Sequence, residues 1–283
     1  MEKSEALKHL IVSGETLVMP DAYDPMSARI IERAGFKAVQ CSGYSMALAM
    51  SIPSEAALGF ERNLTVTRRI AEAVDIPVMA DGEDGFGDPA AVAATVKAYT
   101  EAGAAGINLE DQVLGGAGPK AVVPAEAMVE KVKAARRAAS DSGNPRFVLN
   151  GRTDALAVAS ARADGLREAI RRANLYLEAG ADLAFVTAVA DLEEARTLVK
   201  AIRGPVSIAA GLPYNIQRLS IADLRRAGVA RVSLPSLAVF SAIRSMTCVM
   251  ESLRKSDGFE EILEKNLICS AEDVKALSCA GRR

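Results

Sequence analysis

Four segments with helical spacing end in the dipeptide Ala-Gly, and a short apolar run follows each of them. Glycine stops a helix readily because it adopts the left-handed backbone conformation without a steric penalty. Two further junctions use proline instead. Counting the apolar runs predicts eight strands, at about residues 16–21, 38–42, 77–81, 106–110, 146–151, 183–187, 206–210 and 231–235.

Eight strands that alternate with helices over roughly 240 residues predict an α/β fold of the (β/α)8 barrel type. The segments between the strands support this prediction, since apolar residues such as Val92, Val96 and Tyr99 recur at helical spacing. A doubly wound open sheet is the alternative, but no GxGxxG or GxxxxGK motif supports a nucleotide site in it.

We therefore expect one domain over residues 1–283. It comprises an N-terminal helix at about 1–14, the barrel over 15–255 and a helical extension over 256–283. Helices are expected near 239–255 and 259–280, and the second exceeds what a barrel needs. We expect this extra C-terminal helix to pack on a neighbouring subunit.

Composition excludes several classes of partner. The formal net charge is −2, no basic block occurs, tryptophan is absent and aromatic residues make up 4% of the chain, so nucleic acid is not an expected partner. No stretch approaches the ~18 apolar residues of a membrane span, and the first residues do not resemble a signal peptide. Four scattered cysteines, at 41, 248, 269 and 279, predict neither a disulfide framework nor a zinc site. These features predict a soluble cytoplasmic protein.

The chain has a single histidine, His9, which lies in the N-terminal helical segment and far from every motif. We expect it on the surface. Its position weighs against Ser-His-Asp and Cys-His mechanisms, because both need a histidine beside the nucleophile.

Carboxylates gather where the third and fourth predicted strands end. Side chains two residues apart share one face of a strand, so Asp81 and Glu83 are expected to point the same way, as are Asn108 and Glu110. If these strands are parallel neighbours, three carboxylates meet at their carboxyl ends. Like charges held this close favour a divalent cation as their partner. The alternative is that the acids cap the helices that follow, and Asp84 and Asp88 fit that role.

Polar residues also follow the other strands. Asp21 and Tyr23 come after the first strand, and Asp24 before Pro25 fits a helix cap. After the second strand, Ser42 and Gly43 precede Tyr44, and backbone N–H groups at a glycine can bind a carboxylate. An ordinary tight turn is the alternative there. Arg152 follows the fifth strand and is either a carboxylate clamp or a structural ion pair.

Three motifs together resemble the isocitrate lyase/phosphoenolpyruvate mutase superfamily. They are D-G-E-D-G-F-G at 81–87, L-E-D-Q at 109–112 and G-R-T-D at 151–154, and residues 20–28 resemble the first strand and helix of that family. The likeness spans roughly residues 8–255. It implies an α/β barrel, Mg2+ with Mn2+ as the alternative ion, small 2-oxo or 2-hydroxy carboxylate substrates, reactions through an enolate, and a homodimer or homotetramer.

The resemblance also implies roles for single residues. Asp81 is the direct metal ligand, while Glu83 and Glu110 bind the metal through water, although Glu83 stands where aspartate is usual. The implied substrate-binding residues are Ser42, Gly43, Tyr44, Asp81 and Arg152, and the implied catalytic residues are Arg152, Glu110 and Tyr44.

Besides Glu83, the sequence departs from the family in three places. Lyases of the family carry K-[KR]-C-G-H on the loop after the fourth strand and mutases carry P-K-x-N-S, but the loop at 113–120 has neither. Its glycines suit a mobile lid or a plain flexible connection. Thr187 stands where lyases tend to have glutamate, and residues 209–211 lack the usual asparagine.

These features predict a Mg2+-dependent carbon–carbon lyase that acts on a small 2-oxo or 2-hydroxy di- or tricarboxylate. Oxaloacetate-type decarboxylation fits better than retro-aldol cleavage, because loss of CO2 needs no base to deprotonate a substrate hydroxyl. The alternatives are an enzyme of the phosphoenolpyruvate mutase or phosphonopyruvate hydrolase type, which acts on a phosphorus–carbon bond, and a barrel that binds a 2-oxo acid without turning it over.

Overall fold

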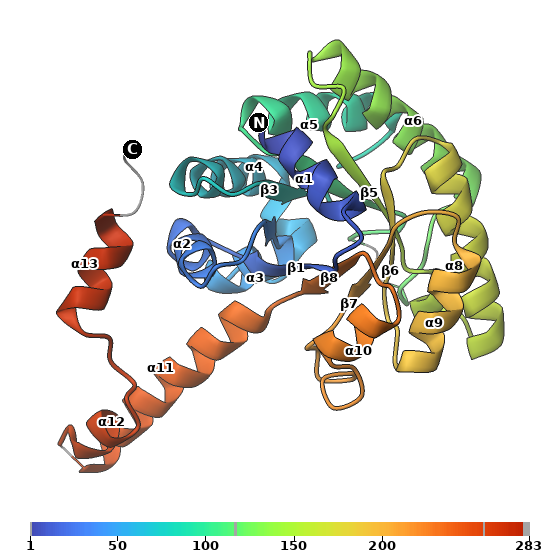
Figure 1. Ribbon diagram of the computed structural model, residues 1–283. Coiled ribbons are helices and arrows are strands. Elements are labelled where there is room, and N and C mark those ends of the chain that lie inside the picture. The colour runs from blue at the N-terminus through green and yellow to red at the C-terminus, as the bar shows by residue number, and fades with distance from the viewer. Residues whose placement is uncertain (1, 116–117, 257, 280–283) are drawn as a thin grey trace.

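A computed structural model of the chain describes residues 2–115, 118–256 and 258–279. Eight parallel strands pair in sequence order and β8 closes on β1, which confirms the predicted (β/α)8 barrel (Figure 1). The strands are β1 (Leu17–Ala22), β2 (Val39–Cys41), β3 (Val78–Asp81), β4 (Gly106–Glu110), β5 (Val148–Thr153), β6 (Leu183–Val186), β7 (Val206–Ala209) and β8 (Arg231–Leu234). Every predicted strand overlaps the observed one, and the Ala-Gly and proline junctions precede β2, β3, β4, β6, β7 and β8 as expected.

Helices surround the barrel (Figure 1). They are α1 (Lys3–Val12), α2 (Pro25–Arg33), α3 (Gly43–Ala49), α4 (Glu55–Ala73), α5 (Pro89–Glu101), α6 (Ala125–Asp141), α7 (Ala155–Val158), α8 (Arg162–Glu178), α9 (Leu192–Ala201), α10 (Ile221–Arg226), α11 (Leu237–Ser256), α12 (Glu260–Glu264) and α13 (Ala271–Cys279). Asp24 caps α2 with Pro25 in its first turn, and Asp88 caps α5, so these two predicted caps are confirmed. Asp84 is not the cap of α5, because its Oδ1 accepts instead from the N–H of Phe86 at 2.9 Å. His9 is exposed on α1, as expected.

Two glycines allow β3, β4 and β5 to approach each other closely. A Cβ added to Gly82 would lie 2.6 Å from the carbonyl oxygen of Asn108, and one added to Gly106 would lie 2.6 Å from that of Val148. Any larger residue at either position would push neighbouring strands apart. The three strand ends that carry the predicted metal and substrate residues are therefore held together by backbone packing.

The inside of the barrel contains a buried cation. Arg231 opens β8 and is fully buried. Its guanidinium donates to Oγ of Ser207 at 2.9 Å, to Oε1 of Gln40 at 2.6 Å and to Sδ of Met19 at 3.2 Å. All three partners are neutral, and burial lowers the pKa of Arg231 to about 10. The guanidinium also lies over the ring of Phe185, 5.5 Å from its centre.

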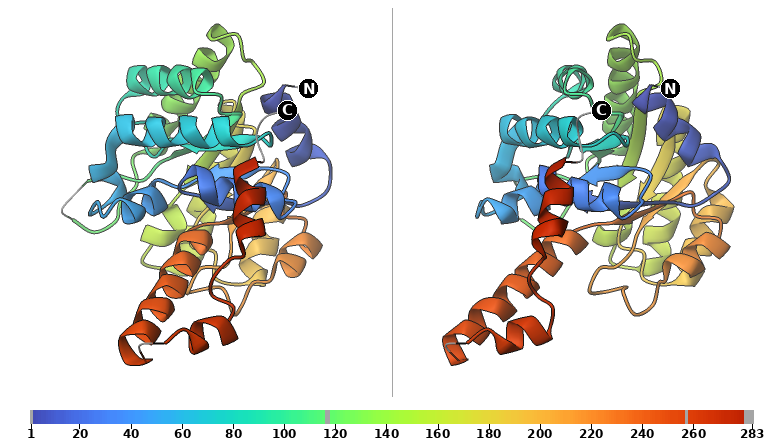
Figure 2. Two further views of the ribbon diagram at one scale, coloured as in Figure 1. Left: turned by 90° about the vertical axis from the view of Figure 1, so that its left-hand side faces the viewer. Right: turned by 60° about the vertical axis from the view of Figure 1, so that its left-hand side comes forward.

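The C-terminal part forms an arm. Helix α11 leaves the barrel directly after β8 and projects away from it, and α13 returns beside α2 (Figures 1 and 2). Arg29 donates to the carbonyl of Leu277 at 3.1 Å, and Arg33 donates to that of Asp273 at 3.3 Å. The prediction of one helix over 259–280 is wrong, because the described part of this segment forms two short helices, α12 and α13. The expectation that the extension packs on a neighbouring subunit stays a prediction.

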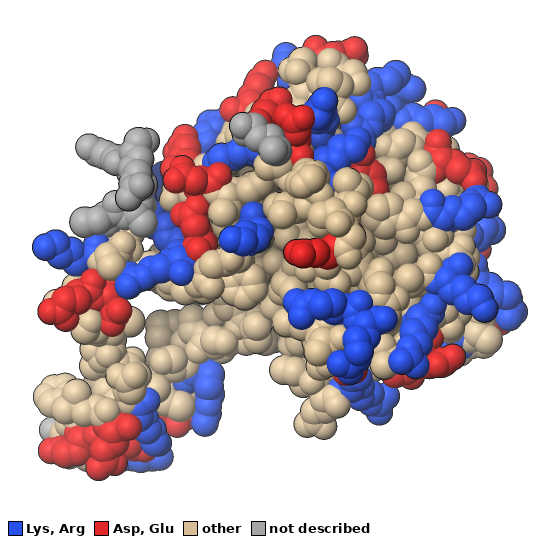
Figure 3. Space-filling view, in the orientation of Figure 1, with Lys and Arg blue, Asp and Glu red and all other residues tan. Residues whose placement is uncertain are grey.

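The surface carries both acidic and basic side chains, as the near-balance of charge in the sequence leads one to expect. On the face shown in Figure 3, acidic and basic side chains are mixed around the barrel, and neutral atoms cover much of the arm. The arm exposes a row of large apolar side chains: Leu237, Phe240, Ile243, Met246 and Met250 on α11, and Phe259, Leu263 and Ile268 beyond it. Within the described ranges, no helix is both long enough and apolar enough to span a membrane.

Candidate active site

A cavity of about 410 Å3 opens at the carboxyl ends of the strands. Its charged lining residues all come from the first part of the chain, and they are Asp21, Glu55, Asp81, Lys120, Arg152 and Asp154. The lining residues from β6 onward are neutral, and the larger of them are Phe185, Leu212, Pro213, Tyr214, Pro235 and Phe240. The cavity thus has a charged side and a mostly apolar side.

Asp81 is the last residue of β3, and its side chain is almost fully buried. Oδ2 accepts a hydrogen bond from the backbone N–H of Gly43 at 2.8 Å, while Oδ1 has no hydrogen-bond partner among the described residues. Gly43 is the first residue of α3, with Ser42 as its N-cap. The carboxylate that meets the Gly43 N–H here is therefore that of Asp81. Burial raises the pKa of Asp81, although the Gly43 N–H and Arg152 lower it in part.

The carboxylate of Glu83 lies near that of Asp81, but the backbone conformation that puts it there differs from the predicted one. Strand β3 ends at Asp81, so the expectation that strand alternation aligns Glu83 with Asp81 is wrong. Glu83 has a left-handed backbone with φ of 48°, which is a strained conformation for a residue with a side chain. Its carboxylate is buried so close to α3 that a Cβ on Gly43 would collide with Oε1. Burial and the charges of Asp81 and Glu110 raise the pKa of Glu83 well above its usual value.

Glu110 and Arg152 face each other across two neighbouring strands. They are register partners at the ends of β4 and β5, and Nη1 of Arg152 lies 2.5 Å from Oε2 of Glu110. Nε of Arg152 donates to Oδ2 of Asp154 at 2.8 Å. Burial raises the pKa of Glu110 to about 8 even though Arg152 lowers it. Burial disfavours the charge on Arg152, but Asp154 and Glu110 outweigh it and raise the pKa of Arg152 well above its usual value.

The three carboxylates have oxygens free for a further partner. Oδ1 of Asp81, Oε1 of Glu83 and Oε1 of Glu110 are buried and accept no hydrogen bond within the described part of the chain. In the same part of the chain, no three acidic, histidine or cysteine side chains converge closely enough to hold one ion directly. Mg2+ usually keeps several waters and contacts only one or two carboxylates. The donor set therefore fits an ion that one carboxylate contacts and the others reach through water.

The remaining predicted substrate residues line the cavity. Ser42 is buried, and its Oγ accepts from the N–H of Ser45 at 3.2 Å. Tyr44 is 47% exposed, and its ring packs edge-on against Phe240 with ring centres 6.4 Å apart. Asp21, at the end of β1, accepts from Oγ of Ser233 at 3.3 Å. The structure brings all the predicted residues to one end of the barrel, and their roles toward a ligand stay predictions.

The sequence of the chain was compared with known protein families and with individual proteins. A family model described as phosphoenolpyruvate phosphomutase matches residues 7–254. The chain belongs to the isocitrate lyase/phosphoenolpyruvate mutase superfamily. The 2-methylisocitrate lyase of Aeropyrum pernix is 30% identical over 263 residues, which make up 92% of this chain and 82% of that protein.

Solved structures of superfamily members superpose closely on this barrel. A phosphonopyruvate hydrolase in complex with oxalate and Mg2+ has a TM-score of 0.86 at 28% identity and covers 98% of this chain and 95% of its own. An oxaloacetate acetylhydrolase in complex with the product oxalate has a TM-score of 0.82 at 25% identity and covers 91% of this chain and 88% of its own. The likeness to these superfamily enzymes supports a carbon–carbon lyase that acts on small carboxylates.

Several lining residues were not predicted from the superfamily motifs. Glu55 is the first residue of α4. The pKa of Glu55 is raised, mainly by burial and to a smaller extent by the negative charge of Asp81. Lys120 ends the loop after β4, and its Nζ lies 2.5 Å from Oδ1 of Asp154. Residues 116 and 117 of this loop lie outside the described residues. The sequence around Glu55 carries no signal that it would line a cavity. The buried charge of Arg231 could have been expected, because this arginine is the first residue of the apolar run that forms β8.

Proposed function

We propose that the protein is a Mg2+-dependent lyase that cleaves a carbon–carbon bond of a small 2-oxo acid, of the size of oxaloacetate, and releases an enolate. The single observation that carries this proposal is the group of buried, unpartnered carboxylate oxygens beside Arg152. A substrate with two carboxylates and a 2-oxo group fits a cavity of this size, and retro-aldol cleavage of a 2-hydroxy analogue is the variant of the same chemistry.

The electrostatics of the site support a bound cation. The pKa values of Asp81, Glu83 and Glu110 are all raised, mainly because burial disfavours their charged forms. The negative charge of Asp81 raises the pKa values of Glu83 and Glu110 further. A divalent ion supplies the missing counter-charge, and the related phosphonopyruvate hydrolase was solved with Mg2+ and oxalate. Asp81, with Glu83 and Glu110 through water, would hold the ion, which would supply Lewis-acid polarisation of the 2-oxo group of the substrate.

The residues of the chain supply orientation and charge. Arg152 presents a guanidinium that Glu110 and Asp154 hold in place, and we assign it to the enolate oxygen, where negative charge develops. Ser42 and Tyr44 line the cavity and hold the substrate carboxylate in this proposal, while the N–H of Gly43 is occupied by Asp81. The neutral wall from Phe185 to Phe240 faces the carboxylate that leaves. Loss of charge as CO2 departs is favoured against such a wall, because an apolar surface solvates an anion poorly.

The first test is pyruvate release from oxaloacetate, 2-methylisocitrate, 2,3-dimethylmalate and phosphonopyruvate, with Mg2+ and with EDTA. We expect turnover of oxaloacetate that EDTA abolishes. We expect Asp81→Asn to lose at least about 100-fold in kcat, since it removes the direct ligand. Asp75→Asn is the matched control, because Asp75 is exposed just before β3, near the opposite end of that strand.

The other outcomes decide between the alternatives. Phosphate release from phosphonopyruvate, followed by phosphorus NMR, would replace the proposal with the phosphorus–carbon chemistry of the hydrolase to which this chain is similar. Binding of oxalate without turnover of any substrate would mean a binding barrel. No binding and no turnover would overturn the proposal altogether.

We also propose that the protein is a homodimer or a homotetramer. The apolar row on α11 supports this, because Ile243, Met246 and Met250 project from an arm that has left its own barrel. Sedimentation velocity of the wild type and of Met246→Asp/Met250→Asp tests it. We expect the double variant to sediment as a monomer, and a wild-type monomer would refute the proposal.

A further inference from the structure

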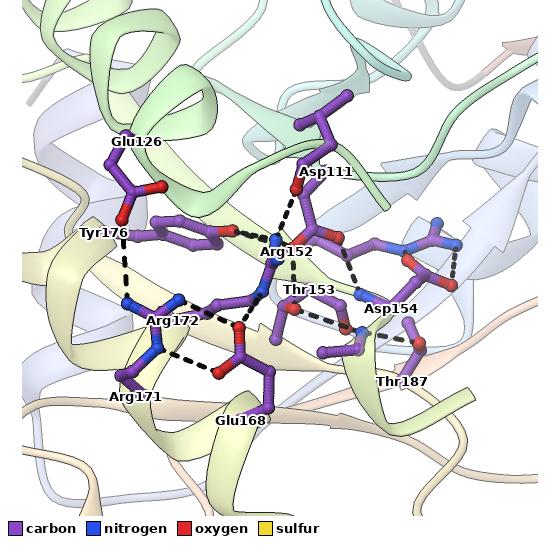
Figure 4. Close-up of polar contacts among 12 residues, drawn as sticks. Asp111, Glu126, Arg152, Thr153, Asp154, Glu168, Arg171, Arg172, Tyr176 and Thr187 are labelled. Atoms are coloured by element: carbon purple, nitrogen blue, oxygen red, sulfur yellow. Dashed lines mark hydrogen bonds and ion pairs between the residues drawn. The ribbon is translucent and has the colours of Figure 1, made fainter. Parts of the chain in front are cut away.

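Asp111 directly follows Glu110 and does not line the cavity. It is fully buried and accepts four hydrogen bonds (Figure 4). Thr153 Oγ1 and the backbone N–H of Asp154 donate at 2.7 and 2.9 Å. Nη1 of Arg172 and the hydroxyl of Tyr176 donate at 3.0 and 2.7 Å. A carboxylate with this many well-placed donors is fixed in position.

The four donors come from separate parts of the barrel. Thr153 and Asp154 lie at the end of β5, while Arg172 and Tyr176 lie on α8. The same Arg172 nitrogen donates to the carbonyl of Val123 at 2.8 Å, and the N–H of Val123 donates to the carbonyl of Asp111 at 2.8 Å. Asp111 therefore ties together the end of β4, the return of the loop after β4, the end of β5 and α8.

This cluster connects directly to the charged side of the cavity. The backbone of Asp154 is held by Asp111, and its side chain holds Nε of Arg152 at 2.8 Å. On the other side, Glu110 holds Nη1 of Arg152 at 2.5 Å and adjoins Asp111 in the chain. Asp111 thus fixes the backbone of Asp154 and directly follows Glu110, the two residues whose carboxylates pair with Arg152.

The two partners on α8 suit this task. Arg172 is 7% exposed and is also paired with Oε1 of Glu168 at 2.7 Å, so its guanidinium has little freedom to move. Tyr176 is fully buried, and burial together with Asp111 raises its pKa, so its hydroxyl keeps its proton and donates.

We propose that Asp111, Arg172 and Tyr176 are positioning residues that set the orientation of Arg152 through Asp154 and Glu110. The proposal rests on the assignment of Arg152 to the enolate oxygen. None of the three reaches the substrate, so their loss should lower kcat and leave KM nearly unchanged. A purely structural role would lower stability without moving the guanidinium of Arg152.

The test compares Tyr176→Phe and Arg172→Met with Arg136→Met. Arg136 is the matched control because it also lies on a barrel helix and pairs with an aspartate, Asp182, at 2.5 Å, but at the opposite end of the barrel. We expect kcat to fall about 10-fold to 100-fold in Tyr176→Phe, with KM changed less than about 3-fold, and to stay unchanged in Arg136→Met. Tyr176→Phe removes one hydroxyl, so it keeps the proposal testable if Arg172→Met does not fold.

A second readout is independent of the reaction. In isotope-labelled protein, the Nε–H signal of Arg152, assigned by its loss in Arg152→Lys, should shift and exchange faster with water in Tyr176→Phe than in the wild type or in Arg136→Met. A shifted signal in a protein that turns over no substrate would support the positioning network and refute the proposed function. An unchanged signal in folded Tyr176→Phe would overturn the network itself.

Discussion

Two arginines lie over the same aromatic ring inside this barrel, but the pKa of one is raised and that of the other is lowered. The guanidinium of Arg152 is 5.7 Å from the centre of the Phe185 ring, and that of Arg231 is 5.5 Å from it. Arg152 has two carboxylate partners, and its pKa is raised. Arg231 has only neutral partners, and its pKa is lowered to about 10.

The difference shows that the hydrogen-bond and ion-pair partners of a buried arginine, and not burial alone, decide whether its pKa is raised or lowered. Carboxylates on two sides of Arg152 fix both its charge and its direction at the cavity. The neutral partners of Arg231 fix its position, while its charge acts at a distance on Asp21 and Asp81, whose pKa values it lowers in part. Arg152 thus lines the cavity with its direction fixed by two carboxylates, whereas Arg231 is fully buried and lowers the pKa values of Asp21 and Asp81 in part.

The largest expected effect follows from removing the arginine at the cavity. Arg152→Met should lower kcat by about 10^3-fold, because a preorganised donor to the developing negative charge is lost. Arg152→Lys should recover little of this, since one ammonium cannot bind Glu110, Asp154 and substrate in the same geometry. Steady-state kinetics on the best substrate of the panel measure both variants, and wild-type activity in Arg152→Lys would contradict the assignment.

A smaller effect is expected for the arginine beneath it. Arg231→Met should lower the free energy of unfolding by about 1–3 kcal/mol, because Gln40 and Ser207 lose a buried partner while an unpaired buried charge is also removed. We expect kcat to fall less than about 10-fold. Urea denaturation and kinetics measure the two changes. A loss of kcat equal to that of Arg152→Met would break the contrast between the two residues.

The smallest effect is confined to acid pH. Arg152 and Lys120 outweigh burial and lower the pKa of Asp154 to about 2, below its value of 3.8 in the unfolded chain. The folded protein binds this proton less readily, so the stabilisation is complete above about pH 4 and is lost as the pH falls toward 2. Between pH 5 and 2, the wild type should lose about 2 kcal/mol more stability than Asp154→Asn. Parallel stability curves for the two proteins would refute this.

The fold could be predicted because its signals are local. A short apolar run marks each strand, and an Ala-Gly or proline junction precedes six of the eight, so the barrel order needs no knowledge of distant contacts. The same holds for Asp81 and Glu110, which end their strands as predicted. Glu83 could not be placed correctly, because its backbone is left-handed and its carboxylate occupies space that Gly43 leaves on another element.

The partners of Arg152 and Asp111 were harder to predict because they are distant in sequence. Arg172 and Tyr176 lie more than fifty residues from Asp111, on a helix whose amphipathic pattern gives no reason to single them out. Arg231 meets Gln40 across 191 residues, and only closure of the barrel brings them together. Motifs therefore identified the charged strand ends, while the network that orients them required the structure.

The division of the cavity lining has an evolutionary consequence. Among the residues that the structure describes, the charged ones that line the cavity all precede β6 in the sequence, and those from β6 onward are neutral. The first half of the gene therefore encodes the groups proposed to perform the reaction. The second half encodes the neutral wall that meets the variable part of the substrate. Recombination between β5 and β6 of two superfamily members could exchange substrate preference while the bond-breaking machinery passes on intact. Such a barrel can acquire new substrates by drift in its second half, without risking the chemistry encoded in its first.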